Sequence, residues 1–186
     1  MEFKVVLKTL IERFNQEGID FALMGAFGMS VTGIIRTTED LDFLIPERDA
    51  IKVSEIMESL GYETLWSGPE TSHYVSPLAS FGRVDFLHAR RKYSRRMLQQ
   101  AKQEAVFNGA FMIKVVRPED IIGLKVQSSS NDPSRYYQDM SDIEQIVKRH
   151  YQGIISLDMG LVREYFKIFD REKELDDLIM RGRNAG

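Results

Sequence analysis

Apolar residues near the start of the chain recur at the spacing of one face of an α-helix. A glycine follows this pattern at position 18. Apolar residues at intervals of three and four turn one stripe of a helix towards a core, and glycine commonly ends a helix. The pattern therefore predicts an amphipathic first helix, and its apolar positions are Phe3, Val6, Leu7, Leu10, Ile11 and Phe14.

Short apolar runs then alternate with helical patterns as far as about residue 117. Apolar runs of this length, bounded by turn residues, indicate buried strands. Helices are predicted at 26–33 and from Pro46 to Gly61. The predicted strands lie at 21–25, 41–45, 62–66, 72–75, 83–89 and 111–116.

From Pro118 onwards only helical patterns occur. Helices are predicted at 118–129, 134–150 and 158–181. The fold class expected from this order is α+β, a mixed sheet flanked by helices with a C-terminal helical portion. We expect two parts, an α/β core over residues 1–117 and a helical portion over residues 118–186 that packs on the core.

Composition excludes several classes of protein and site. The 186 residues are 43% hydrophobic and carry a net charge of −3, so the overall charge does not favour a nucleic-acid coat or a membrane surface. The chain has no cysteine, which removes disulfides, thiol nucleophiles and cysteine-bound zinc. No signal-peptide pattern begins the chain, and no apolar run approaches the ~20 residues of a membrane span. We therefore expect a soluble, cytoplasmic protein with no membrane partner.

Two carboxylates stand at the strand predicted for 41–45. In RTTEDLDFLI (36–45), Asp40 and Asp42 flank Leu41. Residues i and i+2 of a strand point to the same face, so the two aspartates project together, with Leu41 and Phe43 on the opposite face. Close carboxylates repel each other, and a divalent cation such as Mg²⁺, which prefers oxygen ligands, removes the conflict. The alternative is a strand edge with two solvated aspartates.

Two further features favour the metal site. In LMGAFG (23–28), Gly25 ends an apolar strand and Ala26 opens a helix, where backbone N–H groups can approach phosphate oxygens. Asp85 lies between apolar neighbours in the strand predicted for 83–89. A third carboxylate there could complete a two-metal site and accept a proton from an attacking hydroxyl.

The order of these features resembles the nucleotidyltransferase superfamily of the polymerase β type. The matching pattern is Gly25-Ala26, thirteen further residues, Asp40-Leu41-Asp42 with an apolar run, and a later Asp85. RTTEDLDFLI, RPEDIIGLKVQ (117–127) and a helix carrying QDMSDI (138–143) look closest to AbiEii-type toxins and related minimal nucleotidyltransferases. The resemblance covers most of residues 20–150.

The resemblance implies an activity and a set of site residues. It implies transfer of a nucleoside monophosphate (NMP) from a nucleoside triphosphate (NTP) to a hydroxyl acceptor, which would be RNA, protein or a small molecule, with release of pyrophosphate. A toxin of this type would also have an antitoxin partner. The resemblance places Mg²⁺ or Mn²⁺ and the catalytic role on Asp40, Asp42 and Asp85, and nucleotide binding on Gly25, Ala26, Arg36, Thr38 and Lys125.

Two departures from the family pattern favour other functions. Ala26 stands where the family has glycine or serine, and Gln138 stands where many relatives have lysine before the residue that matches Asp139. These departures favour a protein of the same fold that has lost turnover and binds a nucleotide or a partner. An aminoglycoside-type antibiotic nucleotidyltransferase shares the chemistry, but it would need an acidic pocket for a polycationic acceptor.

Three other features each have two interpretations. Lys125 lies on a largely apolar helix face, where it forms either an ion pair with Asp142 or a phosphate contact. The basic run RRKYSRR (90–96) is either a solvated helix start or a landing place for an anionic acceptor such as an RNA end. His73 and His88 fall in predicted strands and are expected to be packed or exposed rather than catalytic.

Overall fold

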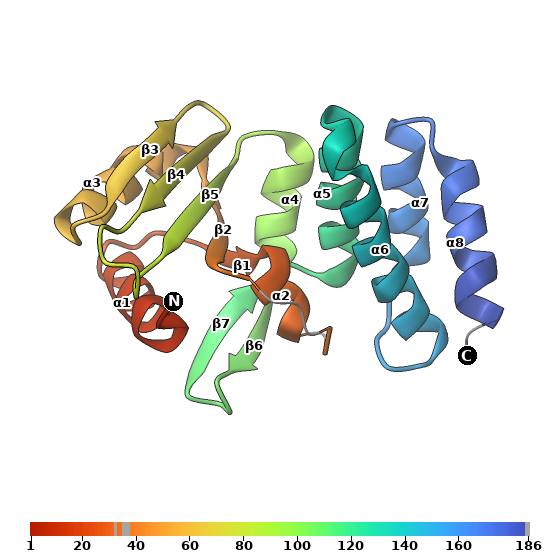
Figure 1. Ribbon diagram of the computed structural model, residues 1–186, viewed down its shortest axis with the longest axis horizontal. Coiled ribbons are helices and arrows are strands. Elements are labelled where there is room, and N and C mark those ends of the chain that lie inside the picture. Colours follow the sequence, from red (N-terminus) through yellow and green to blue (C-terminus); the bar gives the residue numbers. More distant parts are fainter. Residues whose placement is uncertain (32, 35–37, 185–186) are drawn as a thin grey trace. The chain divides into compact units, whose positions relative to one another are not determined.

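The chain divides into two compact units. The structure, a computed structural model, describes residues 1–31, 33–34 and 38–184. Contacts group it into Met1–Arg117, which combines helices and strands, and Pro118–Gly186, which is helical (Figure 1). The predicted α+β fold class is confirmed. That the helical portion packs on the core stays a prediction.

A mixed sheet forms the centre of the first unit. Its described residues make seven strands in the order β3-β4-β5-β2-β1-β7-β6. The pairs β2–β5 and β1–β7 are parallel, and the other neighbouring pairs are antiparallel. The strands are β1 (Ala22–Met24), β2 (Asp40–Pro46), β3 (Glu63–Ser67), β4 (Thr71–Val75), β5 (Arg83–Ala89), β6 (Lys102–Val106) and β7 (Phe111–Val115).

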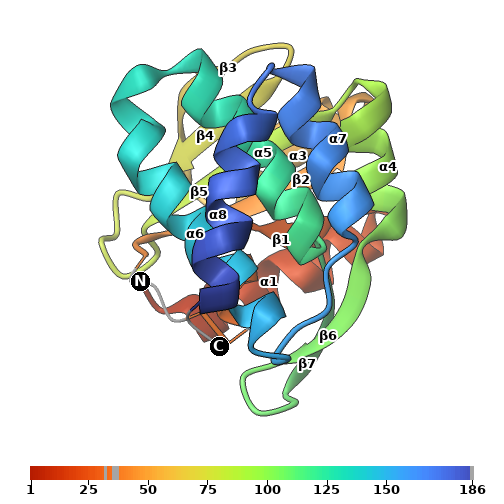
Figure 2. The ribbon, with the colours of Figure 1, turned by 90° about the vertical axis from the view of Figure 1, so that its right-hand side faces the viewer.

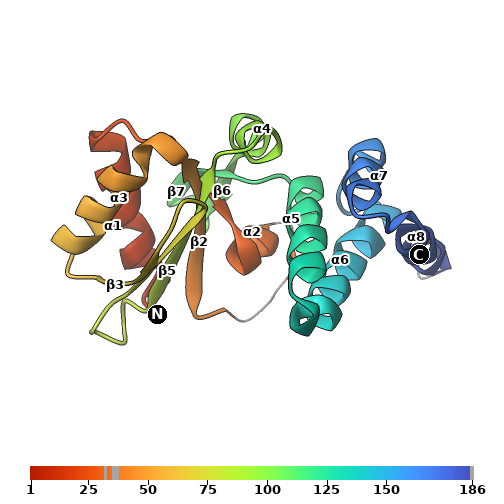
Figure 3. The same ribbon diagram turned by 90° about the horizontal axis from the view of Figure 1, so that it is seen from above.

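Helices lie on both faces of this sheet (Figure 3). On one face the core includes Leu41 and Phe43 of β2, and Phe43 lies 6.0 Å from Phe14 and 5.7 Å from Phe86 between ring centroids. The alternation predicted for β2 is confirmed, because Leu41 and Phe43 are buried while Asp40 and Asp42 are partly exposed. The helices are α1 (Phe3–Gln16) and α3 (Ala50–Ser59) on this face, and α2 (Gly25–Val31) and α4 (Lys92–Gln100) on the other.

The second unit is built from four longer helices (Figure 2). Gly123 lets two of them approach closely, because a Cβ at this position would lie 2.8 Å from the ring of Tyr165. The Tyr165 hydroxyl donates to Asp120 Oδ1 at 2.5 Å. None of the described helices combines the length and apolar character needed to cross a bilayer. The four helices are α5 (Pro118–Asn131), α6 (Tyr136–Tyr151), α7 (Met159–Ile168) and α8 (Glu172–Asn184).

Two elements differ from the sequence-based prediction. The single helix predicted for 158–181 is broken into α7 and α8, and Asp170 between them has a left-handed backbone with φ of 54°. Arg171 then turns inwards and donates to Ser129 Oγ at 2.8 Å, which anchors the break. Strand β6 was not predicted, because KQEAV has neither an apolar run nor β-branched residues before its last position, and it forms by pairing with β7.

Acidification is expected to destabilise the protein through His88 of β5. The side chain is buried, with Nε2 3.1 Å from Ser72 Oγ and Nδ1 3.3 Å from the carbonyl oxygen of Pro69. Burial lowers the pKa of His88 from its usual 6.5, while the Pro69 carbonyl and the charge of Glu47 oppose this shift. His88 was expected to be packed or exposed, and the structure shows it packed.

A lowered pKa in the folded state means that the unfolded chain binds this proton more readily. The stability contributed by neutral His88 is therefore present above pH 6.5 and is lost as the pH falls below it, with a slope of at most about 1.4 kcal/mol per pH unit. Chemical denaturation on both sides of this pH measures the slope, and His88→Gln should make it shallower. Equal slopes in the two proteins would contradict the prediction.

Candidate functional site

Three carboxylates from two strands converge on one face of the sheet. One carboxylate oxygen each from Asp40, Asp42 and Asp85 lies within 4.8 Å of the others, and all three residues are partly buried. The parallel pairing of β2 with β5 makes Asp42 and Asp85 direct partners, and Asp40 stands two residues earlier on the same face. Three negative charges this close disfavour one another unless a cation or hydrogen-bond donors compensate them.

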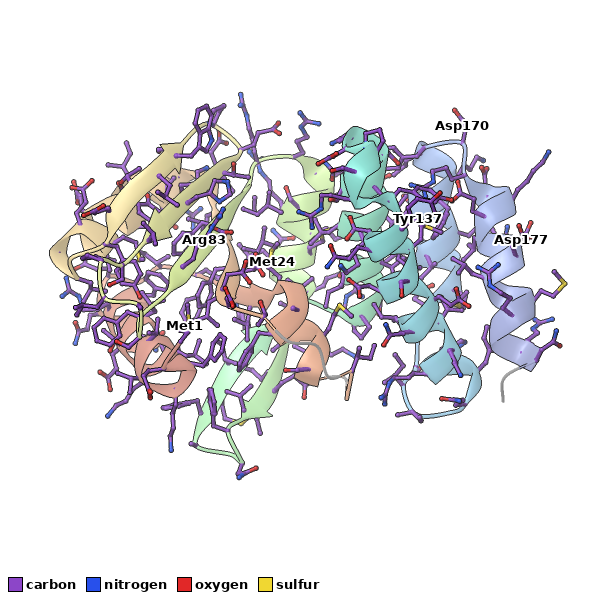
Figure 4. The ribbon with its side chains drawn as sticks, in the orientation of Figure 1. Met1, Met24, Arg83, Tyr137, Asp170 and Asp177 are labelled. Atoms are coloured by element: carbon purple, nitrogen blue, oxygen red, sulfur yellow. The ribbon has the colours of Figure 1, made fainter. Side chains whose placement is uncertain are left out.

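The donor set fits a hard divalent cation. It consists of carboxylate oxygens, which are the ligands that Mg²⁺ and Mn²⁺ prefer, and it contains no sulfur or imidazole ligand that would select a softer metal. Two further residues of the sheet pair directly with the acids of β2. Met24 of β1 pairs with Asp42, and Arg83 of β5 pairs with Asp40 (Figure 4).

Two basic side chains hold one oxygen of Asp85. His73 Nδ1 and Arg83 Nε each lie 2.8 Å from Asp85 Oδ1. A carboxylate oxygen only accepts, so Nδ1 is the protonated ring nitrogen of His73. The hydrogen bond to Asp85 is the largest cause that raises the pKa of Arg83, and the charges of Asp40 and Asp42 add to it. Because both donors bind Oδ1, Oδ2 is the oxygen of Asp85 left for a cation or a proton within the described part of the chain.

Thr38 holds Asp40 in a similar way. Its hydroxyl donates to Asp40 Oδ1, and the backbone N–H of Asp40 lies 3.5 Å from Thr38 Oγ1. Thr38 therefore contacts one of the acids, and the nucleotide contact that the resemblance implies for it stays a prediction. Arg36, to which the resemblance also gives a nucleotide contact, lies outside the described residues.

Gly25 is required by the position of Asp42. It has a φ of +65°, and a Cβ built on it would lie only 1.9 Å from Asp42 Oδ2. Glycine meets two requirements at this position. It adopts the left-handed backbone conformation, and its lack of a side chain leaves room for the carboxylate. Ala26 follows it in α2 and is buried. The structure accordingly brings Gly25 and Thr38 to the three aspartates.

Lys125 belongs to the second unit, where it is buried between two acids. Its Nζ lies 2.6 Å from Asp142 Oδ2 and 3.1 Å from Asp139 Oδ1, and Arg135 Nε lies 3.4 Å from the other oxygen of Asp139. The ion pair with Asp142 that the sequence suggested is present. Removing one partner of such a buried pair leaves an uncompensated charge, so substitution of Lys125 alone should destabilise this unit. The predicted contact of Lys125 with nucleotide phosphate stays a prediction.

The basic segment 90–96 begins α4, and part of its charge is paired. Arg91 Nη2 lies 2.5 Å from Glu70 Oε1, and Arg90 Nε lies 3.3 Å from Glu47 Oε1. Both contacts are exposed and add little to stability. The solvated helix start predicted for this segment is present, and an acceptor-binding role stays a prediction.

Sequence reasoning assigned no role in the site to His73 or Arg83. Arg83 stands two residues before Asp85 in β5, so the shared strand face was a local signal for it. His73 lies in β4, and its register with Asp85 depends on a strand pairing that no local pattern reveals.

Removing the His73 side chain is expected to weaken both metal binding and catalysis. His73→Ala frees Asp85 Oδ1 from one of its two donors. With Asp85 as a proposed metal ligand, loss of a residue that orients it should cost about 10-fold to 100-fold in metal affinity or activity. His73→Asn keeps a donor near the position of Nδ1 and should recover most of both. Mn²⁺ titration and kcat/KM measure the two effects. A His73→Ala variant that matches the unchanged protein in both would contradict this role.

Comparisons with known proteins identify relatives in sequence and in fold. Residues 4–181 match the family model described as "Nucleotidyl transferase of unknown function (DUF2204)". A comparison with curated protein sequences found no match. The solution structure of the antibiotic-resistance factor ANT(2'')-Ia is similar with a TM-score of 0.67 and 12% identity, over 95% of this chain and 97% of that chain.

Two further solved structures share the fold. The antigenic nucleotidyltransferase-like protein from Paracoccidioides brasiliensis gives a TM-score of 0.57 at 17% identity, over 96% of this chain and 92% of that chain. The lincosamide antibiotic adenylyltransferase LnuA gives a TM-score of 0.50 at 15% identity, over 76% of this chain and 96% of that chain. At these identities the likeness shows the fold alone.

Proposed function

The chain belongs to the nucleotidyl transferase family DUF2204, and on this basis we propose that Asp40, Asp42 and Asp85 catalyse transfer of an NMP from an NTP to a hydroxyl acceptor. The observation that carries the proposal is the convergence of the three carboxylates within 4.8 Å. A divalent cation bound by them, Mg²⁺ or Mn²⁺, would polarise the α-phosphate and neutralise the leaving pyrophosphate. The general transfer activity follows from the family, and the residues and the metal are our proposal.

In the proposed reaction each aspartate has a defined position. Asp40 and Asp42 would bind the cation, and the hydroxyl of Thr38 fixes the carboxylate of Asp40. The acceptor oxygen attacks the α-phosphorus of the NTP, and the bond from that phosphorus to pyrophosphate breaks. Asp85 Oδ2 takes the proton of the acceptor hydroxyl, while His73 and Arg83 keep Oδ1 engaged.

The triphosphate is proposed to lie against Gly25 and Ala26. The tight approach of Gly25 to Asp42 supports this position, because the backbone there has no side chain between it and the carboxylates. Arg36 and Lys125 are proposed to contact the nucleotide phosphates, as the family resemblance implies. A positive side chain at either place would lower the energy of the phosphate charges.

The experiment that tests this function uses each α-labelled NTP in turn. The protein is incubated with Mg²⁺ or Mn²⁺ and with RNA, protein or an aminoglycoside as acceptor, and Asp42→Ala serves as the control. Label that moves to an acceptor and depends on Asp42 supports the proposal. NTP binding without a labelled product from any acceptor would instead support the same fold without turnover, the alternative that Ala26 and Gln138 suggest.

A role as the toxin of a toxin–antitoxin pair uses the same chemistry. In that case expression of the unchanged protein should arrest growth, and Asp42→Ala should relieve the arrest. Harmless expression of an enzyme that transfers label in vitro would count against the toxin role, and so against an antitoxin partner, without affecting the proposed reaction.

A further inference from the structure

An exposed tryptophan lies in the same row of the sheet as two of the carboxylates, Asp42 and Asp85. Trp66 of β3 pairs with His73 of β4, His73 pairs with Asp85 of β5, and Asp85 pairs with Asp42 of β2. Directly paired residues of neighbouring strands carry their side chains on the same face of a sheet. Trp66 therefore shares the face of the aspartates and stands two strands from Asp85, or about 10 Å.

A strand irregularity puts the indole on this face. The β3–β4 register shifts between Thr64 and Trp66, so that Leu65 is an extra residue in β3. Thr64 pairs with the buried Tyr74 on the core side, and strict alternation would send Trp66 to that side as well. The bulge instead redirects Trp66 to the side of the carboxylates.

The side chains at the bulge are accessible. Leu65 is 55% exposed and Trp66 is 58% exposed, and Trp66 is the single tryptophan of the sequence. Gly68 supports the ring from the following turn, since a Cβ there would lie 3.0 Å from the indole Nε1. An exposed indole that rests against glycine backbone is a surface for stacking a planar ring.

Positive charge lies close to this surface. The β3–β4 turn is tied to the start of α4, because Glu70 accepts from Arg91 and the Glu70 carbonyl accepts from the backbone N–H of His88 at 2.8 Å. The basic segment 90–96 thus adjoins the turn that follows Trp66. Arg83, which is also exposed, stands two residues before Asp85 in β5. Aromatic rings next to basic residues fit nucleotides, which combine a planar base with phosphate charge.

The order of the strands places the proposed NTP position and the acceptor position on opposite sides of the carboxylate strands. Gly25 follows β1 on one side of the carboxylate strands β2 and β5, while β4 and β3 lie on the other side. With the triphosphate at Gly25, the acceptor approaches over β4 and β3. Asp85 is the carboxylate on that side, next to His73.

We propose that the acceptor is a nucleotide whose base stacks on the indole of Trp66 and whose sugar hydroxyl reaches Asp85. This inference rests on the proposed function. The sugar oxygen forms the new bond to the α-phosphorus of the NTP, the bond from that phosphorus to pyrophosphate breaks, and the hydroxyl proton passes to Asp85. The phosphates of the acceptor lie towards the basic segment 90–96.

The fluorescence of Trp66 tests the stacking directly, because no other tryptophan contributes. An oligoadenylate, AMP and ribose 5-phosphate are each titrated into the protein without NTP. We expect saturable quenching by the base-bearing probes and none by ribose 5-phosphate. Tighter binding of the oligoadenylate than of AMP indicates a strand end as acceptor, and equal binding indicates a mononucleotide. Equal quenching by ribose 5-phosphate, or no quenching by any probe, would overturn the proposal.

Kinetics then assign the site to the acceptor. Trp66→Ala should raise the KM for the nucleotide acceptor about 10-fold to 100-fold, as expected for loss of one stacked base, with kcat and the KM for NTP unchanged. Trp66→Phe should restore most of the affinity. Ile51→Ala is the matched control, because Ile51 is an exposed apolar residue (76%) of α3, on the opposite face of the sheet.

The outcomes separate this inference from the proposed function. If Trp66→Ala changes only the KM for NTP, or neither KM, the acceptor site at Trp66 is wrong. The proposed transfer reaction would not be affected by that result. If the unchanged protein transfers no label to any acceptor, the proposed function fails, and the quenching titration still decides whether a base stacks on Trp66.

Discussion

Asp42→Ala is expected to lower kcat/KM by about 100-fold to 1000-fold, the scale seen when one group that stabilises transition-state charge is removed. Asp42 lies at the centre of the cluster, paired in register with Asp85 and two residues from Asp40. Without it, two carboxylates remain, and they no longer surround a cation. Asp42→Asn should be nearly as damaging, because a neutral amide oxygen replaces an anionic ligand at unchanged size.

The fold of the Asp42→Ala variant should remain intact. Asp42 faces away from the core formed by Leu41 and Phe43, and its removal relieves repulsion among like charges. Without metal, its thermal midpoint should therefore equal or exceed that of the unchanged protein. Added Mn²⁺ should raise the midpoint of the unchanged protein through binding to the folded state, and should not raise that of the variant.

A substitution at an aspartate outside the cluster distinguishes the loss of a proposed metal ligand from the loss of one negative charge. Asp177 of α8 is exposed and lies in the second unit (Figure 4), so Asp177→Ala removes the same charge from the chain and should leave kcat/KM unchanged. Full activity of Asp42→Ala, with Asp177→Ala also active, would end the assignment of the three aspartates as the catalytic centre.

Gly25→Ala is expected to disable the same site by displacing a carboxylate rather than by removing one. The added methyl group would fall 1.9 Å from Asp42 Oδ2, so either the carboxylate or the backbone after β1 must move. Because Asp42 is held in a strand between two neighbours, a shift of its side chain away from the cluster is the easier response. The variant should lose most Mn²⁺ binding and most activity, although every proposed ligand is still present.

The φ of Gly25 adds a second cost that must be measured separately. An alanine in the left-handed region costs about 1–2 kcal/mol in stability without any clash. Gly18 has the same φ of +65°, and a Cβ there meets nothing within 4 Å, so Gly18→Ala measures the backbone cost alone. We expect both variants to be destabilised and Gly25→Ala alone to lose metal binding. Equal Mn²⁺ affinity in the two variants would show that Gly25 does not set the position of Asp42.

Much of the local structure was predictable because its causes are local. Side chains alternate between the two faces of a strand, so the order Asp40-Leu41-Asp42-Phe43 placed Leu41 and Phe43 in the core and the two aspartates on the site face. The burial of Leu41 and Phe43 agrees with this prediction. The spacing of apolar residues in the first helix likewise defined its buried face. Both signals come from the repeat of the backbone itself, which is the same in every protein.

The elements that were missed depend on contacts distant in the sequence. Strand β6 forms because β7 pairs with it, and the break between α7 and α8 is held by Arg171 through Ser129, more than forty residues earlier. The bulge at Leu65 has no signature in ETLWS, because it exists only in the register of β3 against β4. A one-residue shift in such a register moves a side chain to the other face, so Trp66 could not be assigned to a face from its position in the chain.

The sequence by itself determined that Asp40 and Asp42 project together, since side chains two residues apart along one strand share a face whatever surrounds them. Only the tertiary structure decided that Asp85, His73 and Trp66 stand in one row with Asp42. These residues come from three other strands, and their alignment is set by strand pairing and by the packing of Phe43 and Phe86 beneath it. Such pairing is a property of the assembled sheet, and no single strand contains it.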